Sequence, residues 1–461
     1  MKDLTSGSEV KLILLFTLPM LVGNAFQQLY NLVDTVIVGR WVGKEALGAV
    51  GQAFPVIFIS VALVMGFGMA ANVLIAQYFG AGNRERVQAA IDTTLVVVFR
   101  FALVVTVAGL FLAPAILRLM GTPADVMDGA VLYLRIIFAG FIPSFGYNAV
   151  SAILRGLGDS RTPLYALIIA TLINIALDLV FVLVCGWGIA GVGVATVIAQ
   201  LASFIWTILY LRKKNRSVTI RLIGLKMDQQ MFKDSLRMGL PAGIQQALVG
   251  GGLMALTAVV NSFGTNTVAA FSAVSKLDAF VSMPAMNIGM AVSTFTGQNL
   301  GAGRRDRVSR GLKAALAMAM SITVFLAGAL FIRGDFMIAL FSPDSEVIRI
   351  GSEYLKIVAL GYVAHTLMFA YMGVVRGAGE TVFPMLMSLL GMWVIRIPLA
   401  NLLSRYWGTA GIWWAITLGF CASAAGSILY YLFGPWYKKV IVRPAGDVSP
   451  AVSAGIPAQD S

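Results

Sequence analysis

Two aspartates interrupt apolar runs in the first half of the sequence. Asp34 lies in the run NLVDTVIVG and Asp178 in the run NIALDLVFV. A carboxylate near the centre of a membrane helix costs about 2.5–3.5 kcal/mol on insertion scales, so it suggests an ion or substrate path. Tyr30 precedes Asp34 by four residues, and Asn174 precedes Asp178 by four, so each acid has a polar neighbour on its own helix face.

Such acids could bind and release protons. An apolar environment favours the protonated form of a carboxyl group, and two acids facing one cavity favour it further for one of them. The candidate coupling residues are Asp34, Asp178, Tyr30, Asn174, Asn148 and Thr196. Possible cavity-lining residues are Gln27, Gln28, Gln245, Gln246 and His365.

Structural roles for these residues stay open. Asp34 precedes Arg40 by only six residues, so it could sit near a span end as a surface or capping residue. Asn148 and Thr196 could serve as hydrogen-bond partners between membrane helices. Other charged residues within apolar runs, Asp278, Lys276, Arg100 and Arg396, could be functional or could extend to an interface.

The composition indicates where these residues lie. The chain has 461 residues, of which 59% are hydrophobic and only 12% charged, with a mean hydropathy of +0.85. Soluble domains carry about 25% charged residues. Apolar stretches of the length needed to cross about 30 Å of hydrocarbon recur throughout. We therefore expect an all-α polytopic membrane protein.

Twelve spans are predicted, from 11–38 to 410–433. They divide into an N-terminal six-helix lobe over 1–211 and a C-terminal six-helix lobe over 236–435. A polar cytoplasmic linker is predicted over 212–235, and a disordered tail over 444–461.

The basic residues predict the orientation. The N-terminus, the even-numbered loops and the C-terminus hold 23 of the 34 lysines and arginines, whereas the odd-numbered loops hold six. The positive-inside rule then places both termini in the cytoplasm, with the protein in the plasma membrane. The same distribution accounts for the net charge of +13, so no nucleic-acid partner is expected.

The chain repeats itself. GAGNRERV at 80–87 matches GAGRRDRV at 301–308, and RGLGDSRTP at 155–163 matches RGAGETVFP at 376–384. The offset is the same in both pairs, since 301 − 80 equals 376 − 155. Two halves with six spans each share one orientation and can rock around a central cavity.

The two halves differ in their acids. Asp34 corresponds to about Ala255 or Leu256, and Asp178 corresponds to Leu399. The first half therefore carries membrane-embedded carboxylates that the second lacks at these positions.

These motifs resemble the multidrug and toxic compound extrusion (MATE) transporters. The resemblance rests on the Leu-Pro pairs at 18–19 and 240–241, the NLVDTVIVGRWVG segment, the GAGxRxRV loops and the RGxGD loop. It implies two six-helix lobes around a V-shaped cavity and cation-coupled export of diverse, often cationic amphiphilic drugs. In DinF-like members the coupling site corresponds to Tyr30, Asp34, Asn174, Asp178 and Thr196, with a looser match at Asn148.

NorM-like members add a glutamate in the seventh span and an aspartate in the tenth. Both are missing from the corresponding runs here, which favours proton over sodium coupling. Alternatives are a sodium-coupled drug antiporter and a lipid-linked oligosaccharide flippase, for which Arg100 and Arg396 are the only support.

An enzyme is not expected, because the chain has one histidine and no metal-ligand spacing. The expected partners are small-molecule drugs or organic cations and the lipid bilayer. We expect H⁺, or alternatively Na⁺, as the coupling ion, no cofactor or resident metal, and a monomer.

Overall fold

The computed structural model describes residues 2–214, 220 and 224–442. The elements of the N-terminal half are α1 (Glu9–Ile37), η1 (Val38–Val42), α2 (Lys44–Gly80), α3 (Arg84–Leu119), α4 (Ala124–Ala139), α5 (Phe141–Gly156), α6 (Arg161–Asp178), η2 (Leu179–Val184) and α7 (Gly188–Lys214). Those of the C-terminal half are α8 (Gln229–Asn261), α9 (Thr265–Gly301), α10 (Arg305–Ala339), α11 (Ser345–Gly377), α12 (Val382–Leu389), η3 (Leu390–Arg396), α13 (Ile397–Trp407), α14 (Thr409–Phe433) and η4 (Trp436–Lys439).

The predicted all-α membrane fold is confirmed. Ten helical segments of the described chain are long and apolar enough to cross a membrane, and α4 with α5 forms an eleventh span bent by 51°. α9, whose 37 residues include Lys276 and Asp278, is not among these segments, and we count it as the twelfth span because it is equivalent to α2 in the repeat. Several spans combine more than one element, since α1 continues into η1, α6 into η2, and α12 through η3 into α13.

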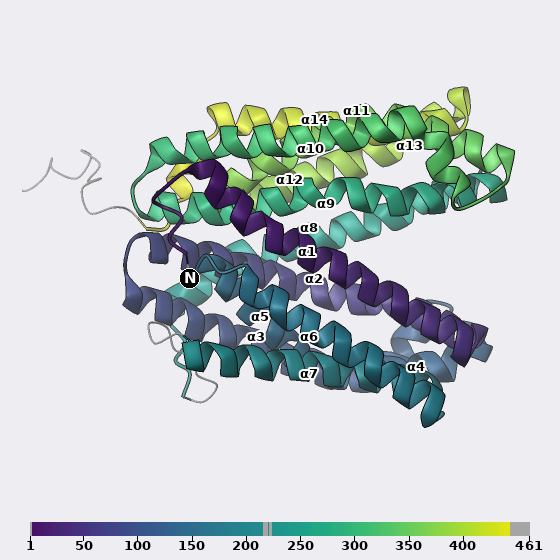
Figure 1. The fold of residues 1–461 in the computed structure, drawn as a ribbon, viewed down its shortest axis with the longest axis horizontal. Helices are drawn as coiled ribbons and strands as arrows, with labels where there is room; N and C mark the ends of the chain where they lie inside the picture. The colour runs from purple at the N-terminus through teal and green to yellow at the C-terminus, as the bar shows by residue number, and fades with distance from the viewer. Residues whose placement is uncertain (1, 215–219, 221–223, 443–461) are drawn as a thin grey trace, which may run out of the picture.

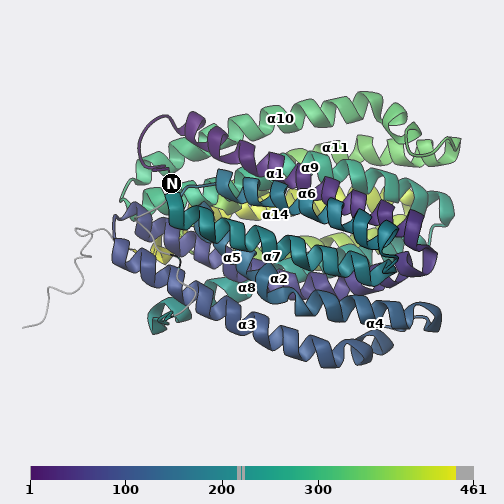
Figure 2. The same cartoon turned by 60° about the horizontal axis from the view of Figure 1, so that its bottom comes forward.

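The helices form two groups. In Figure 1, α3, α5, α6 and α7 occupy one side of the molecule and α10, α11 and α14 the other, with α1, α2 and α8 between them. Figure 2 shows α3 and α10, which are equivalent in the repeat, on opposite sides of the bundle. We call α1–α7 the N-terminal lobe and α8–α14 the C-terminal lobe.

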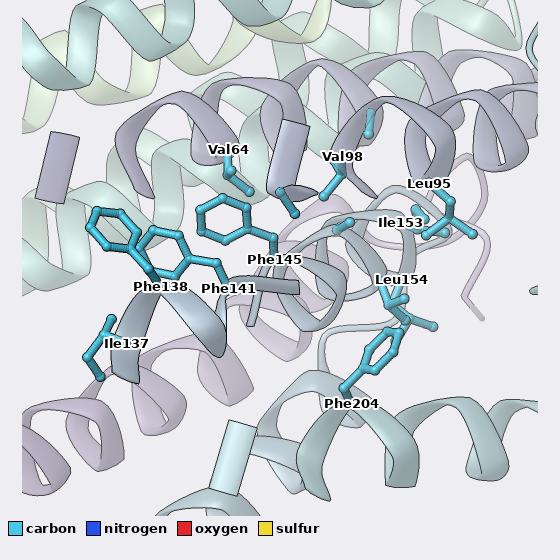
Figure 3. Close-up of a cluster of buried hydrophobic side chains, with 14 of the residues drawn as sticks. Val64, Leu95, Val98, Ile137, Phe138, Phe141, Phe145, Ile153, Leu154 and Phe204 are labelled. Atoms are coloured by element: carbon cyan, nitrogen blue, oxygen red, sulfur yellow. The ribbon is translucent and has the colours of Figure 1, made fainter. Parts of the chain in front are cut away.

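An aromatic core holds the bend between α4 and α5 in the N-terminal lobe. Figure 3 shows Phe138, Phe141 and Phe145 beside Val64 of α2. The rings of Phe138 and Phe141 lie 5.0 Å apart, and those of Phe141 and Phe145 lie 4.6 Å apart. At the bend, a side chain on Gly140 would come within 2.3 Å of Val197 on α7. Only glycine therefore allows α7 to pack this closely against the bend.

The lobes are joined by a pair of equivalent hydrogen bonds. Gln77 Nε2 donates to the carbonyl oxygen of Gly377 over 2.9 Å, and Gln298 Nε2 donates to that of Gly156 over 3.0 Å. The two donors are equivalent in the repeat, and so are the two acceptors, since 298 − 77 and 377 − 156 give the offset of the sequence motifs. We call these two bonds the interlobe seal.

Two glycines bring the seal together. A side chain on Gly80 would lie 1.9 Å from the carbonyl oxygen of Gln298, and one on Gly301 would lie 1.9 Å from that of Gln77. Any larger residue would separate α2 from α9. The two GAG motifs of the repeat therefore begin at the points of closest approach between the lobes.

Both ends of the described chain bind this seal. The Leu4 amide donates to Gln298 Oε1, and the Ile441 amide donates to Gln77 Oε1, each over 2.9 Å. The two ends thus lie at one end of the bundle, as the prediction requires, whereas its cytoplasmic orientation stays a prediction.

The predicted linker over 212–235 overlaps two helix ends, since α7 runs to Lys214 and α8 begins at Gln229. Asp228 caps α8 by accepting from the Met231 amide, and it pairs with Arg86 at 3.2 Å. The predicted tail over 444–461 lies outside the described residues.

Candidate functional site

The two acids of the N-terminal lobe stand where regular helix gives way to π-helix. Asp34 lies in the last turn of α1 before η1, and Asp178 is the final residue of α6 before η2. Such wide turns occur frequently at functional sites. Because α1 packs against α6, the two acids are brought into one cluster.

The cluster joins three helices. The carboxyl groups of Asp34 and Asp178 are direct neighbours. The Tyr30 hydroxyl donates to Thr196 Oγ1 on α7 over 3.2 Å. Asn174 and Asp178 have no exposed surface. Five of the six predicted coupling residues therefore lie together in the interior of the lobe.

Several polar atoms of this cluster are buried without a hydrogen-bond partner of ordinary geometry in the described chain. They are Asp34 Oδ1, both carboxylate oxygens of Asp178 and both amide atoms of Asn174. Buried polar atoms are nearly always hydrogen-bonded in proteins, so these call for a proton, an ion or water. Neither acid belongs to an ion pair among the described residues. The arrangement can hold a proton between two carboxylates.

Tyr133 on α4 is a further member of the cluster that we did not predict. It is only 6% exposed and lies within electrostatic range of Asp34, Tyr30 and Asp178. A signal for it existed in the sequence, because Tyr133 and Tyr354 occupy equivalent positions in the repeat.

The other N-terminal candidates do not take part in the hydrogen bonds described for this cluster. The Asn148 amide donates to the carbonyl of Ser144 in its own helix. Gln27 donates to Asn31, also in its own helix, over 3.4 Å, and Gln28 is exposed on α1.

The C-terminal candidates have different surroundings. Gln245 is 4% exposed; its amide nitrogen donates to Pro384 and Ser388, while its oxygen accepts from Arg376. It therefore ties α8 to α11 and α12. Gln246 is half-buried.

His365 packs between two aromatic rings. Its own ring centroid lies 4.7 Å from that of Phe369 and 4.5 Å from that of Phe420.

A second ionisable cluster lies inside the C-terminal lobe. Asp278 on α9 accepts hydrogen bonds from the hydroxyls of Tyr354 and Tyr362, both on α11. Arg396, at the end of η3, lies within electrostatic range of Asp278. The sequence flagged Asp278 and Arg396 separately and gave no indication that they belong together.

Two similar six-span lobes with polar clusters buried in their interiors define a polytopic membrane protein with the architecture of a secondary transporter. The chain belongs to the MatE family of transporters, whose model matches residues 19–180 and again residues 241–402. The two matches begin at Pro19 and Pro241, the equivalent prolines of the two Leu-Pro pairs, in agreement with the internal repeat.

Curated relatives match over nearly the whole chain. The "Probable multidrug resistance protein YoeA" of Bacillus subtilis is 35% identical over 93% of this chain and 94% of its own length. The "Probable multidrug resistance protein YpnP" of the same organism is 32% identical over 94% of this chain and 97% of its own length.

A solved structure described as the outward-facing conformation of a multidrug resistance MATE family transporter is also similar. It has a TM-score of 0.86 and 25% identity, over 94% of this chain and 97% of that one. The resemblance stated from the motifs is therefore confirmed at the level of the family.

Proposed function

We propose that the protein exports amphiphilic drugs across the plasma membrane by exchange for protons that bind the acids of the N-terminal lobe. The single observation that carries the coupling is the neighbouring pair Asp34 and Asp178. Asp34 Oδ1 and both oxygens of Asp178 are buried without a hydrogen-bond partner of ordinary geometry among the described residues. Drug export is supported by the relatives named as multidrug resistance proteins.

Protons suit this site better than sodium. The runs that hold the C-terminal-lobe acids of sodium-coupled NorM-like members lack them here, and two neighbouring buried carboxyl groups can share one proton. The coupling site then corresponds to that of DinF-like members.

The proposed cycle links the acids to the lobes. Protonation of Asp34 or Asp178 neutralises the cluster, removes its attraction for a cationic drug and changes the packing of α1 against α6. Drug leaves outward, and the protonated carrier turns inward by opening the interlobe seal. Moving one charge through 100 mV is worth about 2.3 kcal/mol, so one or two protons support a modest drug gradient.

The interlobe seal supports alternating access. Two hydrogen bonds and two glycine contacts, all at one end of the bundle, can be broken by a rotation of one lobe against the other. We propose that this end faces the cytoplasm and that a monomer in the lipid bilayer performs the whole cycle.

The test is dye efflux from vesicles that contain the purified protein, with the proton and sodium gradients imposed separately. A proton gradient alone should drive efflux, and Asp34→Asn should abolish it at unchanged protein level. Efflux that follows only the sodium gradient, or that persists in Asp34→Asn, would contradict the proposal.

A further inference from the structure

Arg396 carries hydrogen-bond donors that the described chain does not satisfy. A guanidinium has five N–H donors and no acceptor. Arg396 Nε is buried without a partner, and Arg396 belongs to no ion pair among the described residues. A buried donor without an acceptor costs about 1–3 kcal/mol, and more when it is charged.

The side chain points into the lobe and not toward lipid. Its Cζ lies 4.3 Å from the centroid of the Phe420 ring on α14. A side chain on the neighbouring Gly419 would come within 3.2 Å of Arg396 Nε, so glycine leaves the space for the guanidinium. Asp278 on α9 and His365 on α11 also lie within electrostatic range. Part of the Arg396 side chain nevertheless stays accessible.

Asp278 does not accept hydrogen bonds from these Arg396 donors. Its two carboxylate oxygens accept from Tyr354 and Tyr362, and it forms no direct ion pair with Arg396. Its negative charge offsets part of the desolvation cost of the Arg396 cation without accepting a hydrogen bond from it. The N–H groups of the guanidinium therefore remain available to another acceptor.

The repeat shows which residues of the N-terminal lobe correspond to Arg396 and its neighbours. Asn174 corresponds to Ile395, the residue before Arg396, and Asp178 corresponds to Leu399. Leu256, one of the two positions that could correspond to Asp34, is 1% exposed and part of the apolar core, and the other is Ala255. Arg396 itself corresponds to Ile175, so the C-terminal lobe carries a cation one residue from the position equivalent to Asn174.

From these contacts we propose that Arg396 binds a carboxylate of zwitterionic or acidic cargo. A planar guanidinium resting on an aromatic face can hold a carboxylate through two parallel hydrogen bonds. One cation matches one carboxylate, whereas a pyrophosphate headgroup would need several. The inference deepens the proposed function and rests on it for the identity of the cargo.

The test is binding of two fluorescent probes that differ by one ester group. Tetramethylrhodamine carries a free carboxylate, and its methyl ester is a permanent cation. Anisotropy titrations of the purified full-length protein should show Arg396→Gln weakening the zwitterion about tenfold while the ester binds as before. Arg405→Gln, an exposed arginine on α13, is the matched control and should change neither titration.

Arg396→Lys should lose part of the zwitterion's affinity, because it keeps the charge without the planar fork. Asp278→Asn, which removes the neighbouring negative charge, should bind the zwitterion more tightly than the wild type and gives a second readout if Arg396→Gln does not fold. Equal effects of Arg396→Gln on both probes, or unchanged zwitterion affinity in both Arg396→Gln and Asp278→Asn, would overturn the proposal. Displacement of the zwitterion by pyrophosphate but not by benzoate would overturn it in favour of a lipid-linked cargo.

These titrations need no gradient and no transport. A failure of proton coupling in the vesicle assay would therefore leave their outcome unaffected, and a failure of the carboxylate site would leave proton-driven efflux of the ester intact.

Discussion

The two lobes arrange their buried ionisable groups around equivalent tyrosines, and the groups themselves differ. In the N-terminal lobe Tyr133 lies within electrostatic range of Asp34 and Asp178, which form no ion pair among the described residues. In the C-terminal lobe Tyr354 donates to Asp278, and Arg396 stands nearby. One cluster can take up positive charge, whereas the other is balanced internally and offers free donors.

In the interlobe seal, by contrast, the two halves of the repeat make equivalent contacts. Gln77 and Gln298 make the same bonds to equivalent glycines, and each accepts from backbone amides near one end of the described residues. The repeat is therefore retained where the lobes must move against each other, and it diverges in the lobe interiors. We infer that both halves contribute equally to the motion between the lobes, whereas the ionisable groups in their interiors have different roles.

The largest expected difference between the lobes concerns their acids. Asp178→Asn should abolish proton-driven dye efflux, because it removes one of two carboxylates that can share a proton. Asp278→Asn should retain most of the efflux of a cationic dye, because Asp278 is engaged by two tyrosines. Initial efflux rates in vesicles, normalised to the protein incorporated, measure both. Equal loss in both variants would show that the two clusters act as one site.

The second largest effect is expected when the glycines of the interlobe seal are changed to alanine. A methyl group at Gly80 or Gly301 meets a carbonyl oxygen at 1.9 Å, so either change to alanine must force the lobes apart. We expect a lower melting temperature and strongly reduced efflux for both.

The controls are Gly51→Ala and Gly328→Ala, where the added methyl group meets nothing within 4 Å. These should be neutral or stabilising by up to about 1 kcal/mol, because alanine favours helix. Thermal unfolding followed by fluorescence distinguishes the two pairs, and a seal variant as stable as its control would argue against the close contact.

A smaller and symmetric effect is expected for the glutamines. Gln298→Leu removes one bond between the lobes and one from the Leu4 amide. Gln77→Leu removes one bond between the lobes, one from the Ile441 amide and a longer one of 3.4 Å from the Val442 amide. Net losses of about 1 kcal/mol per hydrogen bond predict similar falls in melting temperature for the two variants. If only one variant is affected, the two halves of the seal are not mechanically equivalent.

The smallest effect should come from Tyr30→Phe, which removes the hydroxyl that donates to Thr196. We expect about 0.5–1.5 kcal/mol of lost stability and a moderate fall in efflux rate. Thr417→Val is the counterpart, since Thr417 is equivalent to Thr196 and donates to the carbonyl of Ile357 over 3.2 Å. It should destabilise the fold by a similar amount without altering the proton dependence of efflux, measured across a series of external pH values.

The class of protein and its internal symmetry can be predicted from the sequence. Hydropathy indicates most of the spans because each must cross the same thickness of hydrocarbon, and the constant offset between the repeated motifs reveals the two halves and completes the number. It also located the acids of the N-terminal lobe, because a carboxylate in an apolar run is unusual and helix spacing places Tyr30 and Asn174 on the same faces.

Only the tertiary structure decided which groups meet. Arg396 and Asp278 are on spans that lie far apart in the sequence, and no local pattern connects them. The same holds for Gln77 and Gly377, which are still more distant along the chain, and for Tyr133 on α4, which lies within electrostatic range of the acids. The physical reason is that helix spacing sets which side chains share a face, whereas packing between helices sets which faces come together.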